Sequence, residues 1–313
     1  MSRTTAPTRR HLLGLLAASA GLSLSTCSAP RPMHVLGASE ERGFYYEFAH
    51  LLSQAVQRSG AAFSITPKTT GGSLENLQLL RENAVDLALA LADLAVESQD
   101  DLLAIGRMYL SYVQLAVPVD SEIRTMSDLR GRTIMLGREG SGTAHVGHRV
   151  LRASGVNVDE VELVDIPLTG LRRALTEGAV DAALFAGGVP NPQMEAGSAP
   201  GGESGIRLLD LSRELGILQE QYGEVYQAAA VPRGIYGATR EVPTIGVATL
   251  LVARAGLPDE VAQGVVEVLI QRSAELVPSG TVGVQYLDPR SLIYTFGIPL
   301  HAGAATAYRK LHG

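Results

Sequence analysis

The sequence predicts an α/β protein of two lobes, each a sheet flanked by helices, with a ligand cleft between the lobes. Stretches with the alternation of strands are followed by stretches with the spacing of helices along most of the chain. The pattern also repeats: residues 84–90 match residues 179–185 at an offset of 95, and Gly37 matches Gly137 at an offset of 100. Any α/β chain shows some internal similarity, but the agreement of the two offsets favours two βαβαβ halves of about 100 residues.

The elements of each half follow from apolar spacing and from glycine stop signals. Apolar residues three and four apart predict the helices, and alternating apolar residues predict the strands. The first half is expected to run strand 33–37, helix 44–59, strand 63–66, helix 74–80 and strand 85–91. The second half is expected to run strand 133–137, helix 143–153, strand 161–166, helix 169–177 and strand 180–185.

Two long apolar stretches, 112–119 and 242–253, are expected to carry the chain from the first lobe to the second and back. A helix should follow Pro258, because proline suits a helix start, and a last helix should begin near Gly303. In open α/β sheets ligands bind beyond the carboxyl ends of the strands, so the loops there should face the cleft. The predicted division is an export signal and tether at 1–32, lobe 1 at 33–118 and 242–313, and lobe 2 at 119–241.

The first 27 residues have the layout of a secretory signal. Arg3, Arg9 and Arg10 precede an uncharged apolar stretch, 12–24, that is too short to cross a bilayer. Residues 8–13 resemble the twin-arginine export signal. We therefore expect a periplasmic or extracytoplasmic protein.

Cys27 is the only cysteine of the chain. Leu24 lies three residues before it, as in a bacterial lipobox, although Thr26 is atypical of that motif. Cys27 is therefore either a lipidation site or a free cysteine beside an ordinary cleavage site. A single cysteine forms no internal disulfide and builds no thiolate zinc site.

Composition excludes further classes of function. Hydrophobic residues make up 46% and charged residues 19% of the chain, which is typical of a globular protein. The formal net charge is −6, and it is −9 without the first 27 residues. Nucleic-acid binding needs a basic surface, so no nucleic acid is expected as a partner.

Four loops rich in glycine or small residues stand between a predicted strand and a predicted helix. Backbone N–H groups at a helix start are unpaired and favour an anion, and glycine lets a ligand approach the backbone closely. Each loop alone is better explained as a tight turn with a Ser or Thr cap. Their matching places in the two halves favour a cleft that clamps a carboxylate or phosphate. The loops are 37–43, 69–73, 137–143 and 186–192.

Enzyme motifs are missing from the sequence. Loop 137–143 lacks the lysine of a phosphate-binding P-loop and the third glycine of a dinucleotide fingerprint, and no Gly-x-Ser-x-Gly elbow exists. His145 and His148 are three residues apart, but no carboxylate has a matching spacing for a metal site. Asp86 and Asp181 occupy equivalent strand positions, which favours structural roles. We therefore predict no catalytic residue, no metal and no cofactor.

Seven strings, in order along the chain, resemble the TAXI family, the extracytoplasmic solute receptors of TRAP transporters. They span nearly all of residues 33–313 and lie at 70–77, 85–89, 137–143, 186–192, 231–236, 242–247 and 299–304. The resemblance implies a type II periplasmic-binding fold without enzymatic activity. It also implies that a small solute, often a glutamate-like or 2-oxo acid carboxylate, is delivered to membrane permease subunits. Contact with the membrane itself would come only through a lipid anchor.

The chain departs from the family pattern in two places. Residues 39–45 stand where the family usually has a Ser-Thr-Gly-Gly segment, and Leu91-Ala92-Asp93 stands where it often has Gln-Ser-Asp. A site that loses hydrogen-bonding groups should lose ligands that need them. Arg42 is expected either to grip an anion with two parallel bonds or to face solvent, paired with Glu40 or Glu41.

The expected site therefore combines donors from both lobes. Residues 70–73 would donate from lobe 1 and residues 140–143 from lobe 2, Tyr45 and Tyr236 would form walls, and Asn191 would orient the ligand. A ligand sensor or an enzyme on the same fold remains an alternative, which the sequence does not separate from transport. The expected ligand-binding residues are Ser39, Arg42, Tyr45, Thr70, Gly71, Gly72, Ser73, Asp93, Gly140, Ser141, Gly142, Thr143, Gly187, Asn191 and Tyr236.

Overall fold

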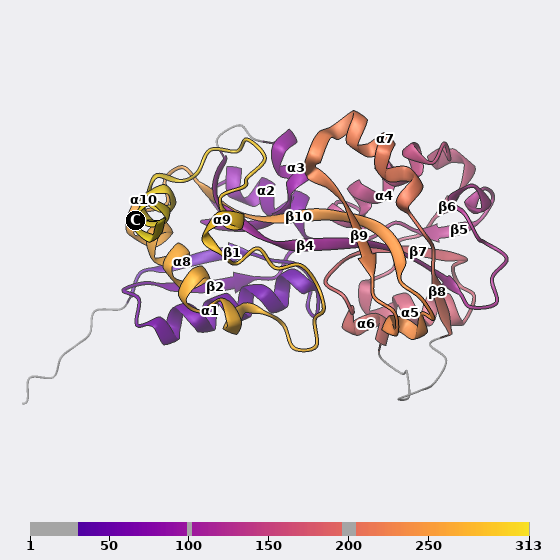
Figure 1. Ribbon diagram of the computed structural model, residues 1–313, viewed down its shortest axis with the longest axis horizontal. Helices are drawn as coiled ribbons and strands as arrows, with labels where there is room; N and C mark the ends of the chain where they lie inside the picture. Colours follow the sequence, from indigo (N-terminus) through magenta and orange to yellow (C-terminus); the bar gives the residue numbers. More distant parts are fainter. Residues whose placement is uncertain (1–30, 99–101, 196–204, 313) are drawn as a thin grey trace, which may run out of the picture. The chain divides into compact units, whose positions relative to one another are not determined.

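One mixed sheet organises the protein (Figure 1). The computed structural model describes residues 31–98, 102–195 and 205–312. The ten strands in this part of the chain follow the order β2-β1-β3-β10-β4-β7-β5-β6, with β9 beside β10 and β8 beside β4. The two long strands β4 (Leu102–Pro118) and β10 (Val242–Arg254) are antiparallel and run through the middle of the sheet (Figure 1).

The two halves of the sheet have the same construction. In the first half β1 pairs in parallel with β2 and β3, and β3 pairs with β10. In the second half β5 pairs in parallel with β6 and β7, and β7 pairs with β4. The predicted fold class, with two βαβαβ halves, is confirmed. The bounds are β1 Met33–Gly37, α1 Phe44–Ser59, β2 Ser64–Lys68, α2 Ser73–Arg81 and β3 Leu87–Leu91, then β5 Thr133–Met135, α4 Gly142–Ala153, β6 Glu162–Leu163, α5 Leu171–Thr176 and β7 Ala182–Gly187.

Several elements between and after the halves complete the sheet and its helical layers. The predicted strand 161–166 is wrong in length, because β6 is an exposed edge strand of two residues. The segment 205–231, for which the sequence analysis made no prediction, forms β8, α7 and β9. The remaining bounds are α3 Ala92–Glu97, α6 Pro192–Glu195, β8 Ile206–Leu208, α7 Ser212–Tyr222, β9 Tyr226–Val231, α8 Asp259–Gln271, α9 Pro289–Leu292 and α10 Ala302–His312.

Helix α1 shows why the local sequence forms this structure. Phe48, Leu52 and Val56 recur every four residues and are buried on the side that packs against β2 and α8. The helix ends at Gly60, whose φ of 77° is left-handed and favours glycine. The spacing and the glycine together fix both the buried face and the end of the helix.

The predicted lobe limits fall at the two long strands. β4 ends at Pro118 and β10 begins at Val242, where the sequence analysis placed the crossings. The division into lobes stays a prediction. The predicted signal, with Cys27, lies outside the described residues.

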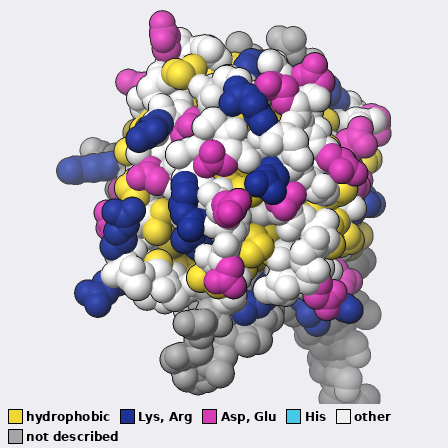
Figure 2. Space-filling view, turned by 90° about the vertical axis from the view of Figure 1, so that its right-hand side faces the viewer, with side chains coloured by type: hydrophobic (Ala, Val, Ile, Leu, Met, Phe, Trp, Pro, Cys, Tyr) yellow, Lys and Arg dark blue, Asp and Glu magenta, His cyan; other side chains and the backbone are white. Residues whose placement is uncertain are grey.

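The surface gives no sign of a strongly basic face at the end of the second half. Figure 2 shows that face, on which basic and acidic side chains are mixed without a large patch of one sign. Among the described helices, none combines the length and the apolar composition needed to cross a bilayer.

Asp86 and Asp181 have equivalent structural roles, as predicted. The Asp86 carboxylate accepts the N–H of Val35 at 2.9 Å, and the Asp181 carboxylate accepts the N–H of Thr133 at 2.9 Å. Asp86 also binds the Arg254 guanidinium at 2.7 and 2.9 Å. Burial opposes ionisation of Asp86, but the Val35 N–H and Arg254 outweigh burial and lower its pKa.

We predict that Asp86→Asn lowers the free energy of unfolding by about 1 kcal/mol at pH 7, because it removes the charge that binds Arg254. The folded pKa of Asp86 is lowered, so its contribution is present above about pH 4 and is lost as the pH falls through that folded pKa. Urea unfolding at pH 7 and at lower pH measures both effects. Asp181→Asn is the matched control: Asp181 is 4.0 Å from Arg132, so its loss should be smaller. Equal losses for the two variants at pH 7 would contradict the prediction.

Candidate functional site

A cavity lies where the carboxyl ends of the strands of both halves meet. Ser39 follows β1, Gly71 follows β2, Arg138 follows β5, and Leu91 and Gly187 end β3 and β7. Its volume is about 90 Å³, which is room for several water-sized groups. This is where open α/β sheets place their ligands.

Three helices begin at the wall of this cavity. α1 starts at Phe44, α2 at Ser73 and α4 at Gly142, and all three residues line the cavity. Within the described part of the chain, no acceptor pairs with the N–H groups of Ser73, Gly142 and Thr143. The Ser141 hydroxyl caps α4 by accepting the N–H of Ala144 at 3.1 Å. Unpaired N–H groups and the positive ends of the helix dipoles therefore face one small space.

The starts of α2 and α4, which come from different halves, approach each other closely. A Cβ on Gly142 would lie 2.5 Å from the Ser73 hydroxyl, and a Cβ on Gly72 would lie 4.0 Å from the N atom of Gly142. Gly72 also has a φ of 108°, which L side chains rarely adopt. Glycine is therefore needed at position 142 for close packing on Ser73 and at position 72 for the backbone conformation.

Hydroxyl groups form the polar part of the cavity beside these amides. The Ser73 hydroxyl accepts the N–H of Leu91 at 3.1 Å and lies 3.2 Å from the Tyr45 hydroxyl. Burial raises the pKa of Tyr45, so this group stays a neutral phenol that can donate. Ser111, which also lines the cavity, shares a hydrogen bond of 2.9 Å with Thr249.

The rest of the cavity wall is formed by apolar side chains and by two charged side chains. Phe44, Leu91, Met135, Leu184 and Phe185 form an apolar wall. One acidic side chain, Glu40, and one basic side chain, Arg138, also line the cavity. The arrangement can hold a compact solute whose polar head meets amides and hydroxyls while its body packs on apolar surface.

The structure brings many of the expected residues to this cavity and places others elsewhere. The expected residues that line it are Ser39, Tyr45, Gly71, Gly72, Ser73, Ser141, Gly142, Thr143 and Gly187. The expected residues that are not among its lining are Arg42, Thr70, Asp93, Gly140, Asn191 and Tyr236.

Three of the residues outside the lining are buried and form hydrogen bonds with other residues of the chain. They are Thr70, Asn191 and Tyr236. The Thr70 hydroxyl donates to the Asn76 side chain at 2.7 Å and accepts the N–H of Gly72 at 3.2 Å. The Asn191 side-chain oxygen accepts the N–H of Gln193 at 3.0 Å, and the backbone N–H of Asn191 donates to the Tyr236 hydroxyl. These groups shape the loops around the cavity.

Arg42 lies in an exposed turn. Its φ is 64°, and the N–H of Gly43 closes the turn on the carbonyl of Glu40. Within the described residues no ion pair joins Arg42 to Glu40 or Glu41. The turn therefore leaves the guanidinium in solvent and away from the cavity lining.

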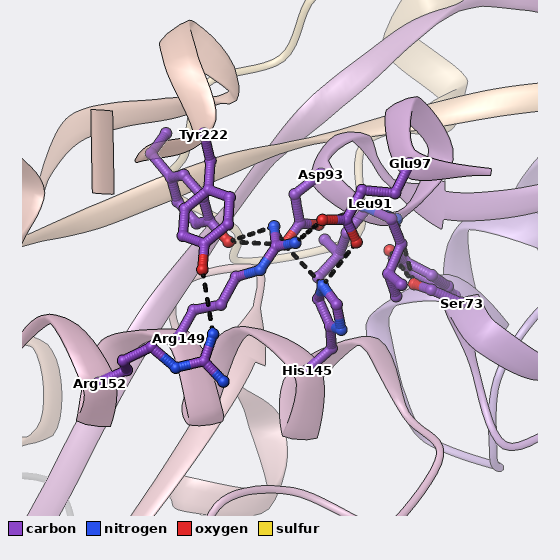
Figure 3. Close-up of polar contacts among 11 residues, drawn as sticks. Ser73, Leu91, Asp93, Glu97, His145, Arg149, Arg152 and Tyr222 are labelled. Atoms are coloured by element: carbon purple, nitrogen blue, oxygen red, sulfur yellow. Dashed lines mark hydrogen bonds and ion pairs between the residues drawn. The ribbon is translucent and has the colours of Figure 1, made fainter. Parts of the chain in front are cut away.

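Asp93 is buried beside the cavity in a network of polar side chains (Figure 3). The Tyr226 hydroxyl donates to its carboxylate at 2.7 Å, and the Arg149 guanidinium lies at 3.3 Å. Burial raises the pKa of Asp93, and Tyr226, His145 and Arg149 act against that rise. Burial also lowers the pKa of His145, whose ring lies 3.4 Å from Glu97.

Asn76 is the most important residue near the site to which the sequence analysis gave no role. It is fully buried, and its amide donates to the carbonyls of Ala38 at 2.7 Å and Leu89 at 2.8 Å. It thereby ties the loop after β1 and strand β3 to α2. Its position on the face of α2 that also holds Ser73 and Leu77 was a signal in the sequence.

Comparison with known proteins identifies the family. A model of the NMT1-like family matches residues 36–310. The chain belongs to the NMT1-like family.

Solved structures share the fold of this NMT1-like chain at low identity. A protein of Bordetella bronchiseptica RB50 is 12% identical with a TM-score of 0.56, over 90% of this chain and 99% of that one. A Xanthomonas citri protein bound to chloride is 15% identical with a TM-score of 0.52, over 89% and 99%. The alkanesulfonate-binding protein SsuA of Xanthomonas axonopodis pv. citri is 18% identical with a TM-score of 0.49, over 90% and 85%. The two likenesses with a TM-score above 0.5 show the fold alone, an α/β fold built on a mixed sheet with flanking helices.

We predict that Asn76→Ala lowers the free energy of unfolding by about 2 to 4 kcal/mol, because two buried carbonyls and the Thr70 hydroxyl lose their partner. Urea unfolding measures the loss. Gln78→Ala is the control, since Gln78 is exposed on the same helix. A loss for Asn76→Ala no larger than that of the control would show that the buried amide does not hold the loops.

Proposed function

We propose that this protein is an extracytoplasmic solute receptor that captures a small anionic solute. The observation that carries the proposal is the convergence of the helix starts of α2 and α4, from opposite halves, on one cavity. Their unpaired N–H groups suit a carboxylate or another oxyanion. The family and the fold support a binding role.

Binding and closure would be coupled through the two long strands. β4 and β10 are shared by both halves, so a change of angle between the halves needs few backbone changes elsewhere. A solute that touches α2 and α4 together gains contacts only when the halves are closed. It would therefore favour the closed state by its differential affinity.

The two charged residues of the lining distinguish between classes of anionic solute. Glu40 and Arg138 are the acidic and the basic side chain at the cavity wall. A simple 2-oxo or monocarboxylic acid would use the amides alone, whereas an amino acid would also place its ammonium group near Glu40. The aliphatic and aromatic wall suits a short apolar body on either solute.

The partner we propose is a TRAP-type permease, as the resemblance to the TAXI family implies. Export through the N-terminal signal, with Cys27 as the candidate lipid anchor, would place the receptor beside that permease. The permease should recognise the closed, ligand-bound form. Docking that is independent of ligand would contradict this step.

A thermal-shift screen of the full chain tests the proposal. A dye must report unfolding, because the sequence has no tryptophan. The panel holds glutamate, glutamine, 2-oxo acids, dicarboxylates, aromatic acids and uncharged analogues. A ligand at about 100 times its dissociation constant should add about 2.7 kcal/mol, which raises the melting temperature by several degrees.

The outcomes of the screen separate the alternatives. A shift with one class of acid supports the receptor and names its solute, and a shift with uncharged analogues alone overturns the anionic assignment. Conversion of a stabilising compound into a product would favour the enzyme alternative. A sensor would bind the solute but would dock to a kinase rather than to a permease.

We predict that Gly142→Ala weakens binding of the solute found in the screen at least tenfold. The added Cβ would lie 2.5 Å from the Ser73 hydroxyl, so α2 and α4 cannot approach fully. The same contact strains the ligand-free protein, so the free energy of unfolding should also fall, by about 1 to 3 kcal/mol, and urea unfolding measures this loss separately. Isothermal titration calorimetry measures the affinity. Gly216→Ala is the matched control, because a Cβ there meets nothing within 4 Å and α7 does not line the cavity. Unchanged affinity in Gly142→Ala would show that close approach of the two helices is not needed.

A further inference from the structure

A buried ion pair joins the two halves beside the cavity, and neither the fold nor the proposed binding role accounts for it. Asp93 belongs to α3 and Arg149 to α4, so one charge comes from each half. The Asp93 side chain is 0% exposed and the Arg149 side chain 6% exposed. Charges this deeply buried are costly unless each is paired.

Arg149 also contacts two tyrosines, one on α7, which packs against α4, and one on β9, which pairs with β10. Its guanidinium lies 3.9 Å from the centre of the Tyr222 ring, which is a cation–π contact, and 3.2 Å from the Tyr226 hydroxyl. Figure 3 shows the side chain extended from α4 between Tyr222 and the carboxylates of Asp93 and Glu97. The two tyrosines therefore orient the guanidinium in addition to the carboxylates that it binds.

Asp93 is likewise oriented by its own helix. Its carboxylate accepts the N–H of Leu94 at 2.8 Å, at the start of α3. Glu97, one turn later on the same helix, also contacts Arg149 and is the more exposed of the two carboxylates. The Asp93 carboxylate and the Arg149 guanidinium are thus both oriented by other neighbours. Little side-chain entropy is therefore lost when these two groups pair.

The pair is tied closely to the cavity. Leu91 lines the cavity two residues before Asp93, and Ser141, Gly142 and Thr143 line it at the start of the helix that carries Arg149. Separating α2 from α4 to admit a solute would also separate α3 from α4. The ion pair would then break, and water would hydrate both charges.

We infer that the Asp93–Arg149 ion pair is a latch that stabilises the closed arrangement of the two halves in the absence of solute. The inference rests on the proposed function in that opening and closing serve solute capture. The pair takes no part in contacting the solute. The ion pair sets the fraction of receptor that is closed before solute binds. It therefore sets how much of the solute's binding free energy is used to close the receptor.

The test measures the distance between the halves without any ligand. Spin labels on Gln78→Cys and Arg173→Cys, exposed residues of α2 and α5, report the distance in the full chain with Cys27→Ser. Pulsed electron spin resonance then gives the populations of closed and open forms. We expect Arg149→Met to lower the closed-to-open ratio about tenfold, as for an interaction of about 1.4 kcal/mol.

Arg254→Met is the matched control, because the Arg254–Asp86 pair lies within the first half alone. It should lower stability and leave the distance distribution unchanged. Asp93→Asn keeps an acceptor for the Tyr226 hydroxyl and gives a second route if Arg149→Met does not fold. It should shift the distribution in the same direction.

An unchanged distribution in the Arg149 or Asp93 variant would overturn the latch, as would a parent protein that is wholly open. An equal shift of the distance distribution in Arg254→Met would show that general destabilisation causes the shift, and it would also overturn the latch. The distance measurement uses no solute, so its result does not depend on the ligand screen. A screen in which no compound stabilises the protein would count against the proposed function but not against the latch.

Discussion

The antiparallel pairing of β4 with β10 is the interaction on which the rest of the structure depends. It runs from Ile245 opposite Val113 to Arg254 opposite Leu102 and is almost wholly buried. β10 then supports the parallel strands of the first half, and β4 supports those of the second. Because both sets end toward the same region, the loops after them meet there. The cavity is therefore a consequence of how two repeated units share one central ladder.

Near the cavity the two halves contact each other through glycines and through the Asp93–Arg149 ion pair. A Cβ on Gly188 would lie 2.0 Å from the Phe44 ring, and one on Gly142 would lie 2.5 Å from the Ser73 hydroxyl. Where glycine permits such approach, backbone amides can meet a ligand directly. A site for the proposed anionic solute would then need no buried lysine or arginine of its own. Among the residues that the structure describes, the buried arginine is Arg149, which is bound to Asp93 outside the lining.

The regular part of this architecture was predictable from local patterns. The spacing of Phe48, Leu52 and Val56 and the glycines at the ends of helices and strands place α1 and its equivalents within a few residues. The network around Asp93 was not predictable, because its hydrogen bonds to Arg149 and Tyr226 span 56 and 133 residues of sequence. Nothing local distinguishes a buried arginine on α4 from a surface one. At Gly72 and Gly142, where backbone conformation decides the position, the expected loop residues lie at the cavity wall. For Arg42 the sequence leaves two side-chain directions open, because nothing local decides between them, and the structure has the side chain exposed.

The two departures from the TAXI pattern therefore have different physical meanings. Ser39 and Glu40 lie at the cavity wall, so the first departure changes what a solute meets there. In the second, Leu91 and Ala92 stand where the family often has two polar residues. Asp93 keeps the aspartate of the pattern and is turned into the protein, where Arg149 pairs with its charge and the Tyr226 hydroxyl donates to it. A carboxylate in that position would repel an anion if it faced the cavity, but paired inside the structure it acts on the approach of α3 to α4. Selectivity and the closed-to-open balance would then be set by separate groups, so that either can change without disturbing the other.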